Sequence, residues 1–194
     1  MTSPQISGPG RAPRLEMSAE EVVRLLDILE AVGIEVWLDG GWGVDAVLET
    51  QSRRHDDLDL IVELGSVEAV EALLARRGYR RVRGAPPMSF ELTDDEGRQV
   101  DVHPVVLDEA GDGSYRMESG EDWVYPASGF AGLGYVAGRR VRCLTPEVQM
   151  LCHTGYEPHH QASYEDVMAL SRRFGIPVPK EYSLPPESYL PRTA

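Results

Sequence analysis

The chain has few of the features that mark specialised classes of protein. It contains two cysteines among 194 residues, Cys143 and Cys152, too few for a disulfide scaffold and without the spacing of a metal site. Basic residues are also scarce, since 19 Lys and Arg stand against 32 Asp and Glu, for a formal net charge of −13. Phosphate backbones are bound by clustered Lys and Arg, so this balance argues against a nucleic-acid partner and favours small-molecule ligands.

Long apolar runs and the common nucleotide-binding motifs are missing as well. No apolar run approaches the roughly 20 residues that span a bilayer, and residues 1–14 lack the apolar centre of a signal peptide. We therefore expect a cytoplasmic protein without a membrane partner. Neither Gly-x-x-x-x-Gly-Lys-Ser/Thr nor Gly-x-Gly-x-x-Gly occurs, which excludes the P-loop and dinucleotide-binding classes.

The most informative stretch is 37–60. It begins Trp-Leu-Asp-Gly-Gly-Trp-Gly-Val-Asp and continues, after a short gap, as Arg-Arg-His-Asp-Asp-Leu-Asp-Leu. This pattern predicts a strand over 35–38, a glycine turn, a short helix over 42–48, a basic loop and a second strand over 57–62. Gly40 and Gly41 carry no Cβ, so the backbone there can approach a ligand closely. The N-terminus of the helix that follows favours a phosphate.

Two carboxylates share one face of the second strand. Asp57 and Asp59 alternate with Leu58 and Leu60, and successive side chains of a strand point to opposite faces. Two acids on one face repel each other unless a cation or bound protons offset the charge, and Mg²⁺ accepts such hard oxygen ligands. The pair predicts a magnesium site. The alternative is that Asp57 and its neighbour Asp56 cap the strand and face solvent.

A further acid lies on the strand predicted over 99–105. By the same alternation Asp101 and His103 share a face. From the residues alone, Asp101 is an acid on a strand, and His103 is a packed or hydrogen-bonded histidine.

These motifs resemble the small antibiotic nucleotidyltransferases of the DNA polymerase β-like superfamily. The blocks at 37–45 and 55–59 are similar to the family signature, with Trp42 after the glycine pair as in the antibiotic subgroups. The lincosamide nucleotidyltransferases are the more similar, followed by the aminoglycoside 2″-nucleotidyltransferases, and the likeness extends over about residues 20–172. One departure is Glu49, where relatives tend to carry glycine after the short helix.

The resemblance implies an α+β nucleotidyltransferase fold, a mixed β-sheet flanked by helices with a small C-terminal helical part. It implies transfer of a nucleoside monophosphate, AMP from ATP, to a hydroxyl of a small antibiotic, with Mg²⁺ as the cofactor. A lincosamide is the first acceptor to expect and an aminoglycoside the second. A non-catalytic nucleotide-binding module is the remaining alternative.

The family also implies a role for each site residue. Asp57 and Asp59 would bind Mg²⁺, and Asp101 would be the third catalytic and metal-binding carboxylate, accepting the proton of the attacking hydroxyl. The nucleotide-binding set would comprise Gly40, Gly41, Trp42, Arg53, Arg54 and His55.

Four regions are expected along the chain. They are a flexible tail over 1–16, a catalytic core over 17–106, a region over 107–175 that completes the acceptor and nucleotide pocket, and an extended tail over 176–194. A homodimer arm is one use of that last tail.

Periodicity and turn residues give the remaining elements. Helices are predicted over 18–32, 66–77, 146–155 and 163–174, and further strands over 79–83, 90–93, 123–125, 133–136 and 139–143, with a turn at 111–113. In the last helix Val167 and Leu170 are expected to face the core and Asp166 a different side. His153 is expected near the nucleotide. His159 and His160 are expected in a surface loop, because no further ligand completes a zinc set with them.

Overall fold

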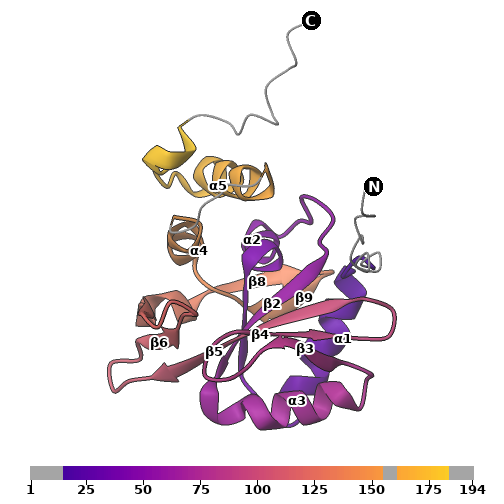
Figure 1. Ribbon diagram of the computed structural model, residues 1–194. Helices are drawn as coiled ribbons and strands as arrows, with labels where there is room; N and C mark the ends of the chain where they lie inside the picture. The colour runs from indigo at the N-terminus through magenta and orange to yellow at the C-terminus, as the bar shows by residue number, and fades with distance from the viewer. Residues whose placement is uncertain (1–14, 155–160, 184–194) are drawn as a thin grey trace, which may run out of the picture.

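A mixed β-sheet forms the centre of the protein (Figure 1), whose residues 15–154 and 161–183 we describe from a computed structural model. Five strands follow the order β1-β2-β5-β4-β3, and β6 and β7 extend the sheet from the end of β5. A separate hairpin of β8 and β9 lies beside β1, joined to it by a bridge between Leu38 and Cys143. The predicted mixed sheet with flanking helices is confirmed.

The elements have the following bounds. The strands are β1 (Val36–Asp39), β2 (Asp57–Glu63), β3 (Arg80–Gly84), β4 (Phe90–Thr93), β5 (Gln99–Leu107), β6 (Gly113–Arg116), β7 (Asp122–Tyr125), β8 (Leu133–Val136) and β9 (Arg139–Arg142). The α-helices are α1 (Ala19–Glu30), α2 (Gly40–Leu48), α3 (Val67–Ala75), α4 (Pro146–Cys152) and α5 (Gln161–Phe174).

Hydrophobic side chains cover both faces of the sheet. Along β2, Leu58 and Leu60 are fully buried in a large cluster that also contains residues of α1, α2 and α3. Ile61 points the other way, into a smaller cluster with Trp37 and Val105. Figure 1 shows α2, α4 and α5 gathered beyond one end of the sheet and α3 at the opposite end, with α1 running beside the sheet. Helix α2 packs against β1 and β2, the two strands that carry Asp39, Asp57 and Asp59.

Local signals in the sequence located most of the elements. Ser18 caps α1 as predicted, with its hydroxyl accepting a hydrogen bond from the amide of Glu21 at 3.3 Å. Ser66 and Thr145 precede α3 and α4, but their side chains make no capping hydrogen bond. The prediction of a turn at 111–113 is wrong at Gly113, which begins β6. This strand was missed because its pairing with β7 is a tertiary contact rather than a local pattern.

The predicted extended tail from 176 onward is corrected in its first residues. A 3₁₀ turn spans Lys180–Tyr182, and Tyr182 is buried in the main cluster. The Tyr182 hydroxyl donates a hydrogen bond to the carbonyl oxygen of His153 at 2.6 Å. Residues 176–183 therefore pack onto the domain.

Three predicted segments lie outside the described residues: most of the N-terminal tail, the loop with His159 and His160, and residues 184–194. Within the described ranges, none of the helices has the length and apolar content needed to cross a bilayer.

Candidate active site

Three aspartates occupy neighbouring positions on three adjacent strands. Strand β1 is antiparallel to β2 and places Asp39 opposite Asp59, while β2 is parallel to β5 and places Asp59 opposite Asp101. Asp57 lies two residues before Asp59 and is opposite Gln99. The pairing of β2 with β5 thus brings Asp59 and Asp101 side by side, although 41 residues separate them in sequence.

The carboxylate of Asp101 is held by a neutral donor. Its two oxygens accept hydrogen bonds from the side-chain amide of Gln99, at 2.7 and 2.9 Å. Burial and the negative charge of Asp59 raise the pKa of Asp101 to about 7. The free protein therefore binds a proton at Asp101 far more readily than an ordinary aspartate would.

His103 belongs to the same group. Its Nε2 lies 3.2 Å from Oδ1 of Asp59, and its ring meets that of Tyr115 edge to face with centroids 5.7 Å apart. Burial disfavours the imidazolium, but the hydrogen bond and charge of Asp59 outweigh burial and raise the pKa of His103. Protonated His103 accordingly offsets part of the charge of Asp59.

Asp39 is a site residue that the sequence did not reveal. It caps α2, with Oδ1 accepting a hydrogen bond from the amide of Gly40 at 2.8 Å, and burial raises its pKa. The one available signal was an acid directly before two glycines, which is also an ordinary helix cap.

The glycine pair is part of a helix rather than a turn before it. Helix α2 begins at Gly40, two residues earlier than predicted, and Gly40 has a φ of 57°. A Cβ at Gly40 would collide with the carboxylate of Asp59, and one at Gly41 would collide with the ring of His55 and the guanidinium of Arg53. Both glycines are needed because side chains of the site itself fill the space beside them.

The predicted nucleotide-binding side chains occupy different surroundings. His55 and Asp45 are both buried and joined through Nε2 and Oδ2 at 2.6 Å, and the ring of Trp42 lies over that of His55 with centroids 4.6 Å apart. Trp42 and Asp45 of α2 thus pack in the interior against His55, and these contacts hold the helix in place. Arg54 is exposed and donates from Nε to Oε2 of Glu16 at 2.6 Å.

Arg53 is tied to the C-terminal helix. Its Nε and Nη2 donate to the two carboxylate oxygens of Asp166, at 3.3 and 2.9 Å. The prediction that Asp166 faces away from the core side of α5 is wrong, since Asp166 is 3% exposed. Burial alone would raise its pKa, but the nearby imidazole of His153 and the hydrogen bonds from Arg53 lower it, and this compensation is why an aspartate is tolerated there.

A cavity of about 630 Å³ opens beside Asp101 and His103. Aromatic and acidic side chains line it, including Phe90, Tyr115, Glu91 and Glu118. Arg83 lies at the same cavity and forms ion pairs with Glu91 at 3.1 Å and Glu118 at 3.7 Å. A small polar molecule placed there would contact Asp101 directly.

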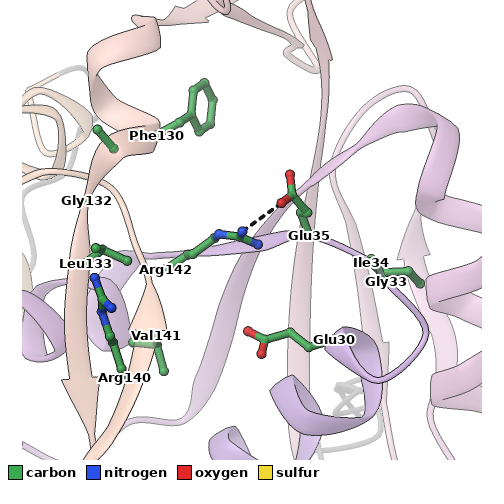
Figure 2. Close-up of a pocket in the computed structure, with 11 residues that line it drawn as sticks. Glu30, Gly33, Ile34, Glu35, Phe130, Gly132, Leu133, Arg140, Val141 and Arg142 are labelled. Atoms are coloured by element: carbon green, nitrogen blue, oxygen red, sulfur yellow. Dashed lines mark ion pairs between the residues drawn. The ribbon is translucent and has the colours of Figure 1, made fainter.

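Another cavity, of about 670 Å³, lies between the end of α1, the start of β1 and the β8-β9 hairpin (Figure 2). Glu35 and Arg142 form an ion pair of 2.8 Å within it. Its described lining contains neither Asp59 nor Asp101, so this cavity is separate from the acids.

The donor set is suited to a magnesium ion that shares its coordination with a ligand. In the described ranges, no three side chains of His, Cys, Asp and Glu are arranged closely enough to hold a metal ion by themselves. Mg²⁺ is commonly bound through one or two carboxylates, with water and substrate phosphates as its other ligands. The adjacent carboxylates of Asp59 and Asp101 offer the hard oxygen donors that such a site requires.

Comparison with known structures identifies the class of protein. The solved structure of the lincosamide antibiotic adenylyltransferase LnuA with lincomycin bound superposes with a TM-score of 0.72 at 28% identity, covering 81% of this chain and 98% of that one. ANT(2″)-Ia in complex with adenylyl-2″-tobramycin shares the fold, with a TM-score of 0.64 at 22% identity and coverage of 79% and 87%. The fold is that of a nucleotidyltransferase.

Sequence comparison identifies the family. The family model described as aminoglycoside-2″-adenylyltransferase matches residues 21–169, and the chain belongs to this family. A lincosamide resistance protein of Staphylococcus haemolyticus is 30% identical over 141 residues, which cover 73% of this chain and 87% of that protein. A 2″-aminoglycoside nucleotidyltransferase of Escherichia coli is 28% identical over 134 residues, covering 66% and 69%. The resemblance inferred from the sequence motifs is therefore confirmed.

Proposed function

We propose that the protein transfers AMP from Mg-ATP to a hydroxyl of a lincosamide. The observation that carries this proposal is the register of β2 and β5, which aligns Asp59 with Asp101, a residue that lines a cavity of about 630 Å³. Metal-assisted phosphoryl transfer needs carboxylates that share a cation and a group that takes a proton from the nucleophile. Asp57, Asp59 and Asp101 would hold Mg²⁺, which when bound neutralises charge on the phosphate oxygens.

Asp101 is the proposed base. Its pKa of about 7 in the free protein allows it to accept a proton near neutral pH, and it lines the cavity from which the acceptor hydroxyl would approach. The hydroxyl oxygen forms a bond to the α-phosphorus, its proton moves to Asp101, and the bond to pyrophosphate breaks. His103 stabilises the negative charge of Asp59 beside this step.

The triphosphate is proposed to lie at the first turn of α2. Amides of the first turn of a helix have no partner within the helix, and together with the helix dipole they attract phosphate. Arg53 lies against Gly41 at this turn and adds a positive charge. Trp42 and His55 support α2 from the core, and Arg54 adds a further cation at the edge of the site.

The lincosamide acceptor is favoured by the relative that matches at 30% identity and is named for lincosamide resistance. An aminoglycoside is the second candidate, because the carboxylates of Glu91, Glu118 and Asp101 surround the cavity and the family model is described by that substrate class. Arg83 neutralises part of this acidic lining, which lowers its preference for an acceptor with several positive charges.

A pyrophosphate-release assay with Mg-ATP and lincomycin, clindamycin, kanamycin or tobramycin tests the proposal. We expect release with the two lincosamides and mass addition of one AMP to the drug. Asp57→Asn should abolish release while leaving the circular dichroism spectrum unchanged. Binding of Mg-ATP without release with any acceptor would instead support a non-catalytic module, and full activity of Asp57→Asn would contradict the mechanism.

A further inference from the structure

Asp166 is a buried carboxylate that neither the sequence motifs nor the proposed chemistry uses. It lies on α5, which packs against α2. Val167 and Leu170, which are on the same helix and also point into the core, are fully buried in the main cluster. The helix is therefore docked by apolar contacts, and Asp166 is carried into the interior beside them. A buried carboxylate at this position is costly unless it is paired, so its partners define what it does.

The first partner is Arg53, 113 residues earlier in the chain. Two donors of the guanidinium, Nε and Nη2, bond the two oxygens of Asp166, and a third, Nη1, bonds the carbonyl oxygen of Arg54 at 3.3 Å. A guanidinium has five N–H donors in a rigid fork, so this arrangement fixes its plane and leaves donors unused. Arg53 is thus held in one orientation while it can still bind an anion.

The second partner is His153, the residue that ends α4. Its Nε2 lies 3.6 Å from Oδ2 of Asp166, and its Nδ1 lies 2.8 Å from the carbonyl oxygen of Gln149, the geometry of an N–H donor. One carboxylate thereby faces two groups that can carry positive charge. When His153 is protonated, this cluster of Arg53, His153 and Asp166 has a net positive charge.

The cluster is placed beside the first turn of α2. Nη2 of Arg53, the atom bonded to Asp166, would be 2.6 Å from a Cβ at Gly41. The oriented guanidinium therefore lies at the start of α2, where the helix dipole is positive and the amides after Gly40 have no partner within the helix. The absence of a side chain at Gly41 is what allows this approach.

We propose that Asp166 is a positioning residue for the nucleotide: it orients Arg53 against the first turn of α2 and so couples binding of the triphosphate to the docking of α5. This inference rests on the proposed nucleotidyl transfer. It gives α5, which is far from the acids in sequence, a part in binding the phosphates, because Asp166 orients Arg53. Asp166 itself does not contact the reacting atoms.

The test is calorimetric titration of the full chain with Mg-ATP in the absence of any acceptor. Asp166→Asn should raise the Kd for Mg-ATP about tenfold, because the amide cannot keep the charge-assisted two-point bond to Arg53. The matched control is Glu165→Gln, which removes a carboxylate one residue away that bonds Gln161 instead. This control should change the Kd by less than about twofold.

A double-mutant cycle separates positioning from a merely structural effect. In an Arg53→Ala background, Asp166→Asn should add less than about twofold to the Kd, since no guanidinium remains to be oriented. In steady-state assays Asp166→Asn should raise the KM for ATP and leave the KM for the acceptor unchanged. The inference would be overturned if Asp166→Asn raised the Kd for Mg-ATP by the same factor in the parent protein and in the Arg53→Ala variant. It would also be overturned if the Kd of Asp166→Asn were no higher than that of Glu165→Gln.

Arg53→Lys provides a second route if Asp166→Asn does not fold. Lysine keeps the positive charge but cannot form the two-point bond, so the Kd for Mg-ATP should again rise about tenfold. A Kd equal to that of the parent protein would overturn the inference. Nucleotide binding is measured without an acceptor, so a failure of transfer to every drug would count against the proposed transfer and would be distinguishable from a failure at Asp166.

Discussion

Two aspartates in this protein, Asp101 (partly buried) and Asp166 (buried), have pKa values shifted in opposite directions. Asp101 on β5 is bonded by the neutral amide of Gln99 and lies beside Asp59, and its pKa rises to about 7. Asp166 on α5 is bonded by the guanidinium of Arg53, and its pKa falls. Burial by itself raises the pKa of both carboxylates, so the partner decides the sign. The protein compensates the charge of Asp166 itself, whereas in the proposed mechanism a cation would compensate that of Asp101.

The largest effect that follows from this comparison is on catalysis. Asp101→Asn keeps the shape of the side chain but removes the base, so the rate of AMP transfer should fall by about 10³-fold or more. Binding of Mg-ATP should change less, since Asp57 and Asp59 remain to hold the cation and the phosphates are proposed to lie at α2. Single-turnover measurements with saturating ATP check this, and a loss of less than tenfold would remove Asp101 from the chemistry.

The same two residues should have opposite effects on stability. The raised pKa of Asp101 means that the folded state binds more protons than the unfolded chain between about pH 4 and 7, so its contribution to the free energy of unfolding falls as pH rises through that window. Asp101→Asn should therefore stabilise the metal-free protein at pH 8, by about 2 kcal/mol.

Asp166 has a lowered pKa in the folded state. Its contribution to the free energy of unfolding is therefore fully present at pH values above the ordinary pKa of aspartate, and it is lost as the pH falls through the folded-state pKa. Asp166→Asn should destabilise the protein at pH 8 by about 3 kcal/mol, because Arg53 is left half-buried without its partner. Urea unfolding at pH 5 and pH 8 measures both differences. Stability changes of the same sign for the two variants would contradict this account.

A smaller effect is expected at Gly41, which lies against the side chains of Arg53 and His55. Gly41→Ala would push a methyl group into the ring of His55 and the guanidinium of Arg53, at a cost of about 2 kcal/mol in the free energy of unfolding. Nucleotide binding should weaken as well, because Arg53 must move. Gly65→Ala is a control, since no atom lies within 4 Å of a Cβ there. Equal stability of both variants would show that Gly41 is not packed as described.

The smallest effect is expected at the other end of α2. Glu49 ends this helix with a φ of 58°, the left-handed conformation that glycine adopts without strain. Glu49→Gly should raise the free energy of unfolding by about 0.5 to 1 kcal/mol and leave kcat and KM unchanged. Thermal unfolding and the transfer assay measure these two quantities, and destabilisation would show that the Glu49 side chain supplies a contact that outweighs the backbone strain.

Much of the site could be inferred from local pattern. Alternation along a strand puts Asp57 with Asp59 and Asp101 with His103, and the structure keeps Leu58 and Leu60 in the core as that alternation requires. Helix α1, its cap at Ser18 and the short helix after the glycines follow from signals within a few residues of each other. The unusual backbone at Glu49 was also visible, as a departure from the glycine of its relatives.

What the sequence determined by itself is which side chains share a face, because that depends only on the repeat of a strand or helix. The tertiary structure alone decided that β2 and β5 pair in a register that aligns Asp59 with Asp101, and that Asp39 joins them from β1. It also decided that Asp166 is buried against Arg53. A charged residue can face the core only where a partner from elsewhere in the chain compensates it, and no local pattern records that partner.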